Sequence, residues 1–112
     1  MAGLRLLQRG STQAAIDFTA TGDNTIVAGV AGQTIRVVKM FFIVGAATNV
    51  TIKDGTGTNL TGAMPFAANG GLVLDEARDP WFTTSSGNAF VLNQSGTATI
   101  AGRIYYEQST PR

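Results

Sequence analysis

Three of the seven acidic residues, Asp75, Glu76 and Asp79, lie close together and could do chemistry. Their carboxylates could contribute to a Ca²⁺ site, which needs about six to eight oxygen ligands. They could also form one half of the carboxylate pair that cleaves a glycosidic bond. However, Arg78 lies among them, and the sequence has no second acidic cluster to complete either site. We therefore interpret this segment as a solvated loop with a local ion pair.

Other catalytic groups are missing from the sequence. It has no His, which excludes a Ser-His-Asp triad and an ordinary zinc-hydrolase site. It has no Cys, which excludes disulfides, thiolate zinc sites, iron–sulfur clusters and cysteine nucleophiles. Residues 54–57 lack the Lys-Ser/Thr pair and the following helix of a phosphate-binding loop, so we interpret them as a hairpin turn. We expect no enzymatic activity, no metal and no cofactor.

Trp81 and Phe82 form the largest aromatic pair in the chain. An exposed pair could stack on a sugar or anchor a protein partner. A buried pair would close one end of a β-barrel or β-sandwich. We favour burial.

The chain contains few charged residues. They make up 13% of it, against ~25% in an ordinary soluble domain. With a formal net charge of +1, nucleic acid is not an expected partner. No run approaches the ~18 apolar residues of a membrane span, and charged residues interrupt the apolar stretch that a secretory signal would need. Because interface cores are depleted of charge, the composition instead favours a protein that assembles with others.

Residues 1–12 are expected to form an arm that is separate from the domain of residues 13–112. The alternative is a disordered terminal tail without a contact, since terminal residues are often disordered. A free tail would leave its three leucines exposed to water, so we favour an arm that orders on a neighbouring subunit. The candidate contact residues of this arm are Leu4, Arg5, Leu6, Leu7 and Arg9.

Beyond the arm the pattern is that of β-structure throughout. Short runs rich in Val, Ile, Phe and Thr alternate with clusters of Gly, Asn and Asp, at roughly the 8–12-residue spacing typical of sandwiches and barrels. We predict a single all-β domain, a jelly-roll-like β-sandwich of about eight short antiparallel strands. The expected strands are residues 14–20, 25–28, 34–44, 49–53, 60–66, 71–74, 88–93 and 97–107.

The strand predicted for residues 34–44 has apolar residues on both faces beyond position 37. A half-buried strand should alternate apolar with polar residues. Either this strand is central in a two-layer core, or its second face packs against another chain. Each sheet of a sandwich has an outer face, so we favour the second interpretation. In the last strand, Ile100 and Ile104 are expected to face the core. The candidate contact residues of these two strands are Met40, Phe42, Arg103 and Tyr105.

Several short motifs follow one another in a suggestive order. They are GQTIRV at residues 32–37, NVTIKDG at 49–55, LTGAM at 60–64, NGG at 69–71, WF at 81–82, GNAFVLN at 87–93 and AGRIYY at 101–106. This order resembles that of small all-β structural proteins encoded by tailed bacteriophages and prophages, and the resemblance covers about residues 33–107.

Within that class the chain is similar to capsid decoration, or cement, proteins, which form β-sandwich or β-tulip trimers on icosahedral heads and clamp neighbouring coat proteins. The resemblance implies a non-enzymatic protein of the virion, made in the host cytoplasm and placed on the capsid surface. Its implied partners are further copies of itself, as a homotrimer, and the phage major capsid protein. The chain is also similar to small tail- or fibre-associated proteins, which implies as the alternative a receptor- or carbohydrate-binding module.

Overall fold

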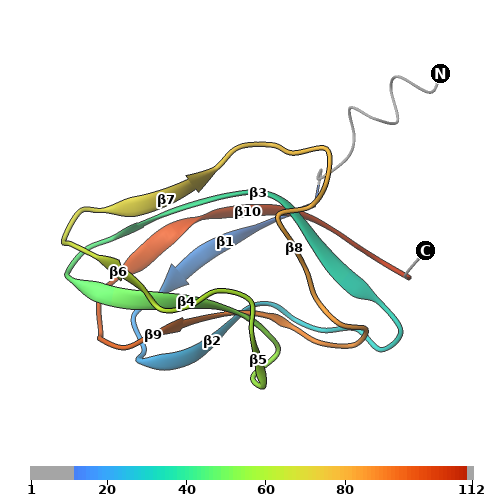
Figure 1. Cartoon of the computed structure of the whole chain (residues 1–112), viewed down its shortest axis with the longest axis horizontal. Coiled ribbons are helices and arrows are strands. Elements are labelled where there is room, and N and C mark those ends of the chain that lie inside the picture. Colours follow the sequence, from blue (N-terminus) through green and yellow to red (C-terminus); the bar gives the residue numbers. More distant parts are fainter. Residues whose placement is uncertain (1–11, 111–112) are drawn as a thin grey trace.

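The computed structural model describes residues 12–110, and every regular element in that range is a β-strand (Figure 1). This confirms the all-β prediction. The predicted contact residues Leu4, Arg5, Leu6, Leu7 and Arg9 lie outside the described residues. Within 12–110 the ten strands are β1 (Thr12–Phe18), β2 (Gly22–Val27), β3 (Thr34–Val44), β4 (Thr48–Asp54), β5 (Thr58–Asn59), β6 (Met64–Phe66), β7 (Gly71–Leu74), β8 (Phe82–Thr83), β9 (Phe90–Gln94) and β10 (Ile100–Ser109).

The strands form two antiparallel sheets, which lie as two layers (Figure 1). In the first sheet the strand order is β1-β10-β3-β7, and β8 also pairs with β3. In the second sheet the order is β2-β9-β4-β5, and β6 also pairs with β4. The architecture is therefore a β-sandwich, as predicted. Its longest strands, β3 and β10, lie side by side in the first sheet.

The core lies between the two sheets and is built from inward-facing residues of both. Phe66 of β6 meets Phe42 of β3 edge to face, with ring centroids 5.5 Å apart, which is a favourable aromatic arrangement. Ile100 and Ile104 of β10 are buried, as predicted. The buried cluster is Ile16, Val27, Ile35, Val37, Met40, Phe42, Val44, Val50, Ile52, Phe90, Leu92, Ile100 and Ile104.

Gln94, at the end of β9, is a buried polar residue. Its Oε1 accepts hydrogen bonds from the Thr48 hydroxyl and the Ala98 N–H, both at 3.0 Å. Its Nε2 donates to the carbonyl oxygens of Ala98, at 2.9 Å, and Ala20, at 3.3 Å. Because the donors and acceptors of this side chain are all paired, its burial costs little. It connects β4 and β9 to the chain segments that leave β1 and enter β10.

The register between β3 and β10 shifts by one residue at Val38. Lys39 lies opposite Tyr105, whereas Val37 lies opposite Tyr106. Val38 is therefore an extra residue on β3, as in a β-bulge, where two residues of one strand oppose one residue of the other.

This bulge changes which residues of β3 are buried. Before it, the odd-numbered Ile35 and Val37 face the core; beyond it, the even-numbered Met40, Phe42 and Val44 do. Met40 and Phe42 are 0% and 1% exposed. Their assignment to a contact surface is therefore wrong, because the bulge turns them inward. The odd-numbered residues beyond the bulge face outward instead.

The backbones of β10 and β7 both come close to the backbone of β3 at Phe41 and Phe42. A Cβ atom placed on Gly102 of β10 would overlap the carbonyl oxygen of Phe41 and would lie 2.7 Å from Cα of Phe42. From the other side, a Cβ atom on Gly71 of β7 would overlap the carbonyl oxygen of Phe42. Any side chain at either glycine would push the strands apart.

We predict that Gly102→Ala lowers the free energy of unfolding by roughly 2–3 kcal/mol, since its new methyl group meets backbone that cannot rotate away. Urea unfolding followed by circular dichroism measures the loss. The matched control is Gly62→Ala, whose Cβ atom would have nothing within 4 Å. The control is expected to stay within ~0.5 kcal/mol of the unmodified protein. Equal stabilities of the two variants would contradict the close approach.

Candidate interaction surface

The outer face of the first sheet has a contiguous group of exposed apolar side chains. Phe41 and Ile43 point outward from β3 beyond the bulge, and Val73 of β7 lies directly opposite Phe41. These three residues are 38%, 58% and 71% exposed, respectively. We call Phe41, Ile43 and Val73 the apolar patch. The neighbour of Ile43 on β10 is the small residue Ala101, so no bulky side chain lies beside Ile43 on that side, whereas Phe41 has Arg103 as its neighbour on β10.

Trp81 is a further exposed apolar residue, in the connection between β7 and β8. The next residue, Phe82, pairs with Val37, and its ring centroid is 6.1 Å from that of the core residue Phe90. Trp81 itself is 46% exposed and therefore points away from the core. Its Nε1 donates to the carbonyl oxygen of Asp75 at 2.7 Å, which fixes the indole. Burial of the aromatic pair is thus confirmed in part for the half-buried Phe82 and is wrong for Trp81.

Arg103 and Tyr105, both predicted as contact residues, lie on the same outer face. Arg103 is opposite Phe41 in the sheet, and its Nη1 donates to Oε1 of Gln13 at 3.1 Å. The Nζ atom of Lys39 lies 5.1 Å from the centroid of the Tyr105 ring, within the range of a cation–π interaction. Both cations of this region therefore already have partners within the domain.

Sequence reasoning missed the three residues of the apolar patch for two different reasons. The choice of Met40 and Phe42 as contact residues leaves out Phe41 and Ile43 on the opposite face, because nothing in the sequence marks the bulge; the apolar character of both faces is nevertheless the correct signal for an exposed surface. Val73 lies between two leucines in a four-residue strand. So short a run does not indicate which face is outward.

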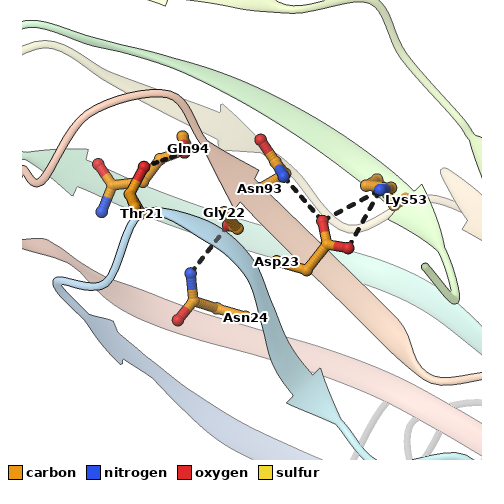
Figure 2. A network of polar contacts seen from close by, with 7 residues as sticks. All are labelled: Thr21, Gly22, Asp23, Asn24, Lys53, Asn93 and Gln94. Atoms are coloured by element: carbon orange, nitrogen blue, oxygen red, sulfur yellow. Dashed lines mark hydrogen bonds and ion pairs between the residues drawn. The ribbon is translucent and has the colours of Figure 1, made fainter.

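The second sheet, in contrast, has a polar network that links three of its strands (Figure 2). Asp23 of β2 accepts a hydrogen bond from Nδ2 of Asn93 on β9 at 2.7 Å. Its two carboxylate oxygens lie 3.0 and 3.2 Å from Nζ of Lys53 on β4. The hydrogen bond from Asn93, followed by that from Lys53, holds the pKa of Asp23 below its ordinary value. Three adjacent strands are thereby linked through side chains of the domain itself.

A second carboxylate, Asp54 at the end of β4, is buried. It accepts hydrogen bonds from the Ser85 N–H at 3.0 Å, the Ser85 hydroxyl at 2.7 Å and Asn88 Nδ2 at 3.0 Å. Burial by itself would raise the pKa of Asp54, but these hydrogen bonds outweigh it and the pKa lies below its ordinary value. These hydrogen bonds link the end of β4 to the 84–88 loop.

The acidic segment forms no site with other described residues. Asp75, Glu76 and Asp79 are exposed in the connection between β7 and β8, as expected for a solvated loop, but within residues 12–110 none of them forms the expected local ion pair. Within residues 12–110, no three His, Cys, Asp or Glu side chains are grouped so that they could hold a metal ion. No helix in the same range is long and apolar enough to cross a membrane.

No protein-family model, curated protein or solved structure matches this chain. Similarity to other proteins therefore assigns no function to either outer face. The functional interpretation rests on the difference between the two sheets: the second has polar side chains that bond to one another, and the first leaves apolar side chains exposed.

We predict that Asp54→Asn makes the protein less stable at neutral pH and less sensitive to acid. The folded-state pKa of Asp54 lies below the ~3.9 of an unfolded chain, so the ionised carboxylate stabilises the fold above that value. This stabilisation is lost as the pH falls through the folded-state pKa. At pH 7 the variant is expected to lose about 1–3 kcal/mol of unfolding free energy, because its amide group faces donors.

Urea unfolding at pH 7 and at pH 3 measures this effect. The difference between the unmodified protein and Asp54→Asn should shrink at the lower pH. Asp17→Asn, at an exposed position of β1, is the matched control and should change stability little at either pH. A difference of the same size at both pH values would show that ionisation of Asp54 does not stabilise the fold.

Proposed function

We propose that this chain is a non-enzymatic structural protein of a bacteriophage virion, a capsid decoration or cement protein that binds the assembled head as a homo-oligomer. The expected oligomer is a trimer, and the expected strand arrangement is that of a jelly-roll-like β-tulip. The observation that carries the proposal is the apolar patch of Phe41, Ile43 and Val73, exposed on the outer face of a regular sheet. Its expected partners are further copies of the chain and the major capsid protein.

Contiguous apolar surface of this kind supports a role in assembly. Single exposed apolar residues are common, but grouped ones mark surfaces that bind another molecule. Trp81 is exposed, with its Nε1 bonded to Asp75 just after β7, and Tyr105 and Arg103 lie on the same face as the patch; these residue types are enriched at protein interfaces. The low charge of the whole chain agrees with the same interpretation.

A decoration protein acts through equilibrium binding and needs no catalytic group. It binds the assembled lattice and not the separate coat subunits, so it stabilises the lattice by mass action. An oligomer also contacts several coat subunits at once, and this avidity can exceed single-site affinity by ~100-fold. The contact residues therefore have to supply area and shape complementarity.

The alternative function is a receptor- or carbohydrate-binding module, and the exposed, fixed indole of Trp81 favours it. Aromatic rings held in place by a hydrogen bond offer a flat surface for a sugar ring. For this alternative we expect hits on a glycan array that Trp81→Ala abolishes, whereas Val30→Ala, another exposed apolar position, keeps them. An array without hits contradicts the alternative.

For the main proposal we predict that the protein sediments as an oligomer at micromolar concentration, and that Val73→Lys weakens self-association at least about tenfold. The lysine places a charge in the patch, and since Val73 is 71% exposed in the single chain, the variant should still fold. Sedimentation velocity over a dilution series measures the association.

The matched control is Thr25→Lys, at an exposed position on β2 of the second sheet, which should leave the association unchanged. The same proteins are then centrifuged with assembled heads of the phage or prophage that encodes the chain. The unmodified protein and the Thr25 variant are expected in the pellet, and the Val73 variant in the supernatant. A monomer at every concentration that stays in the supernatant would overturn the proposal.

A further inference from the structure

We propose that residues 1–11 of one copy lie across the apolar patch of a neighbouring copy, with Leu4, Leu6 and Leu7 packed on the patch. This inference deepens the proposed function and rests on it, because it requires the chain to self-associate. It names the occupant of the surface that residues 12–110 leave exposed.

The first argument is the match of apolar side chains. The patch consists of three apolar residues on two adjacent strands, and nothing in the described part of the chain covers them. The eleven residues that precede β1 include three leucines, which would gain from leaving water. The domain therefore leaves three apolar side chains exposed, and the segment before β1 of the same chain has three leucines that could pack on them.

The second argument is charge. The leucine-bearing segment also contains Arg5 and Arg9. Two exposed carboxylates border the patch: Asp17 is next to Ala101 in the sheet, and Asp75 follows directly on β7. Within residues 12–110 neither carboxylate takes part in an ion pair.

Two cations lie on the same face. Arg103 is opposite the patch residue Phe41, and its Nη1 donates to Gln13; Lys39, nearer the start of β1, lies over the ring of Tyr105. Within residues 12–110 neither cation forms an ion pair with Asp17 or Asp75. An arriving basic segment can therefore pair with these two carboxylates at the rim, where such contacts steer association.

The third argument is direction and reach. β1 starts at Thr12, opposite Tyr106, and runs towards Phe18, opposite Ile100. The rows of the sheet that contain the patch lie downstream of Thr12, since Arg103 pairs with both Ala15 and Phe41. A chain that continues backwards from Thr12 along the strand leaves its own patch behind.

The segment is long enough to reach a copy that packs against its own domain. Leu4 lies eight residues before Thr12, so an extended chain can place it up to ~26–29 Å from Thr12. This reach is comparable to the two shorter extents of the domain, 26 and 20 Å, and is smaller than the longest, 46 Å. Exchange of identical segments between copies is an inexpensive route to an oligomer.

The absence of Cys from the chain makes a direct test simple, because each introduced thiol is unique. In the full-length protein with Val73→Cys, we expect maleimide to react about tenfold more slowly than in the same protein with Leu4→Ser, Leu6→Ser and Leu7→Ser added. A thiol introduced by Thr25→Cys on the second sheet should react at the same rate in both backgrounds. Equal rates at position 73 in the two backgrounds would overturn the inference.

The source of the segment is tested by mixing two single-thiol proteins, one with Leu6→Cys and one with Val73→Cys, of which only one has an affinity tag. Mild oxidation should give a mixed disulfide-linked dimer containing both. If instead the bond forms only within a chain that has both substitutions, the segment covers its own domain and the inference fails.

The failure of this inference differs from that of the proposed function. If Val73→Lys breaks the oligomer while the three Leu→Ser substitutions change neither its mass nor the thiol rate, the patch meets another surface and the proposed function stands. If the unmodified protein is a monomer that ignores assembled heads, the proposed function fails and this inference fails with it. Trp81, the single tryptophan, gives an independent reading: its emission should shift to longer wavelength on dilution of the oligomer.

Discussion

The single extra residue at Val38 in β3 determines the character of the whole first sheet. β3 is the strand that connects β10 to both β7 and β8, so its alternation sets the alternation of its neighbours. The bulge allows Ile35 and Val37 to share one core with Phe42, although their positions differ by an odd number of residues. It also turns Phe41 and Ile43 outward. The core and the exposed patch are consequences of the same irregularity.

Both ends of the sandwich are held by buried polar side chains rather than by further apolar packing. Gln94 connects β4, β9 and two loops at one end, and Asp54 connects β4 to the 84–88 loop at the other. Each of these side chains is surrounded by donors and acceptors in suitable positions, which removes most of the cost of its burial. A chain with few charged residues thus places two of its polar groups where they fix loops between strands. Because these polar groups hold the loops from inside, the side chains on the outer faces of the two sheets can differ in polarity.

The sequence was sufficient for the class of fold because strand period and turn residues are local signals. The strands around residues 34–44, 49–53, 71–74 and 88–93 follow from runs of Val, Ile, Leu and Phe, and the buried face of β10 follows from its alternation. β8 could not be predicted, because Phe82 and Thr83 form a strand only by pairing with β3. Likewise, Gly22, Asp23 and Asn24 read as a turn but belong to β2, where Lys53 and Asn93 hold Asp23 in place. The bulge and the outward direction of Trp81 depend on such long-range pairing as well.

The polar network of Asp23, Lys53 and Asn93 has a consequence for which substitutions the domain can accept during evolution. The two outer surfaces share no side chain, since each is built from the strands of a different sheet. If the first sheet is covered in an assembly, as we propose, the hydration and colloidal stability of the assembled particle would be set by the second sheet and the adjoining loops. Substitutions in the second sheet would then change these solvent-facing properties and leave the contacts between subunits intact. In the proposed assembly, two selective pressures would thus act on two separate layers of one sandwich.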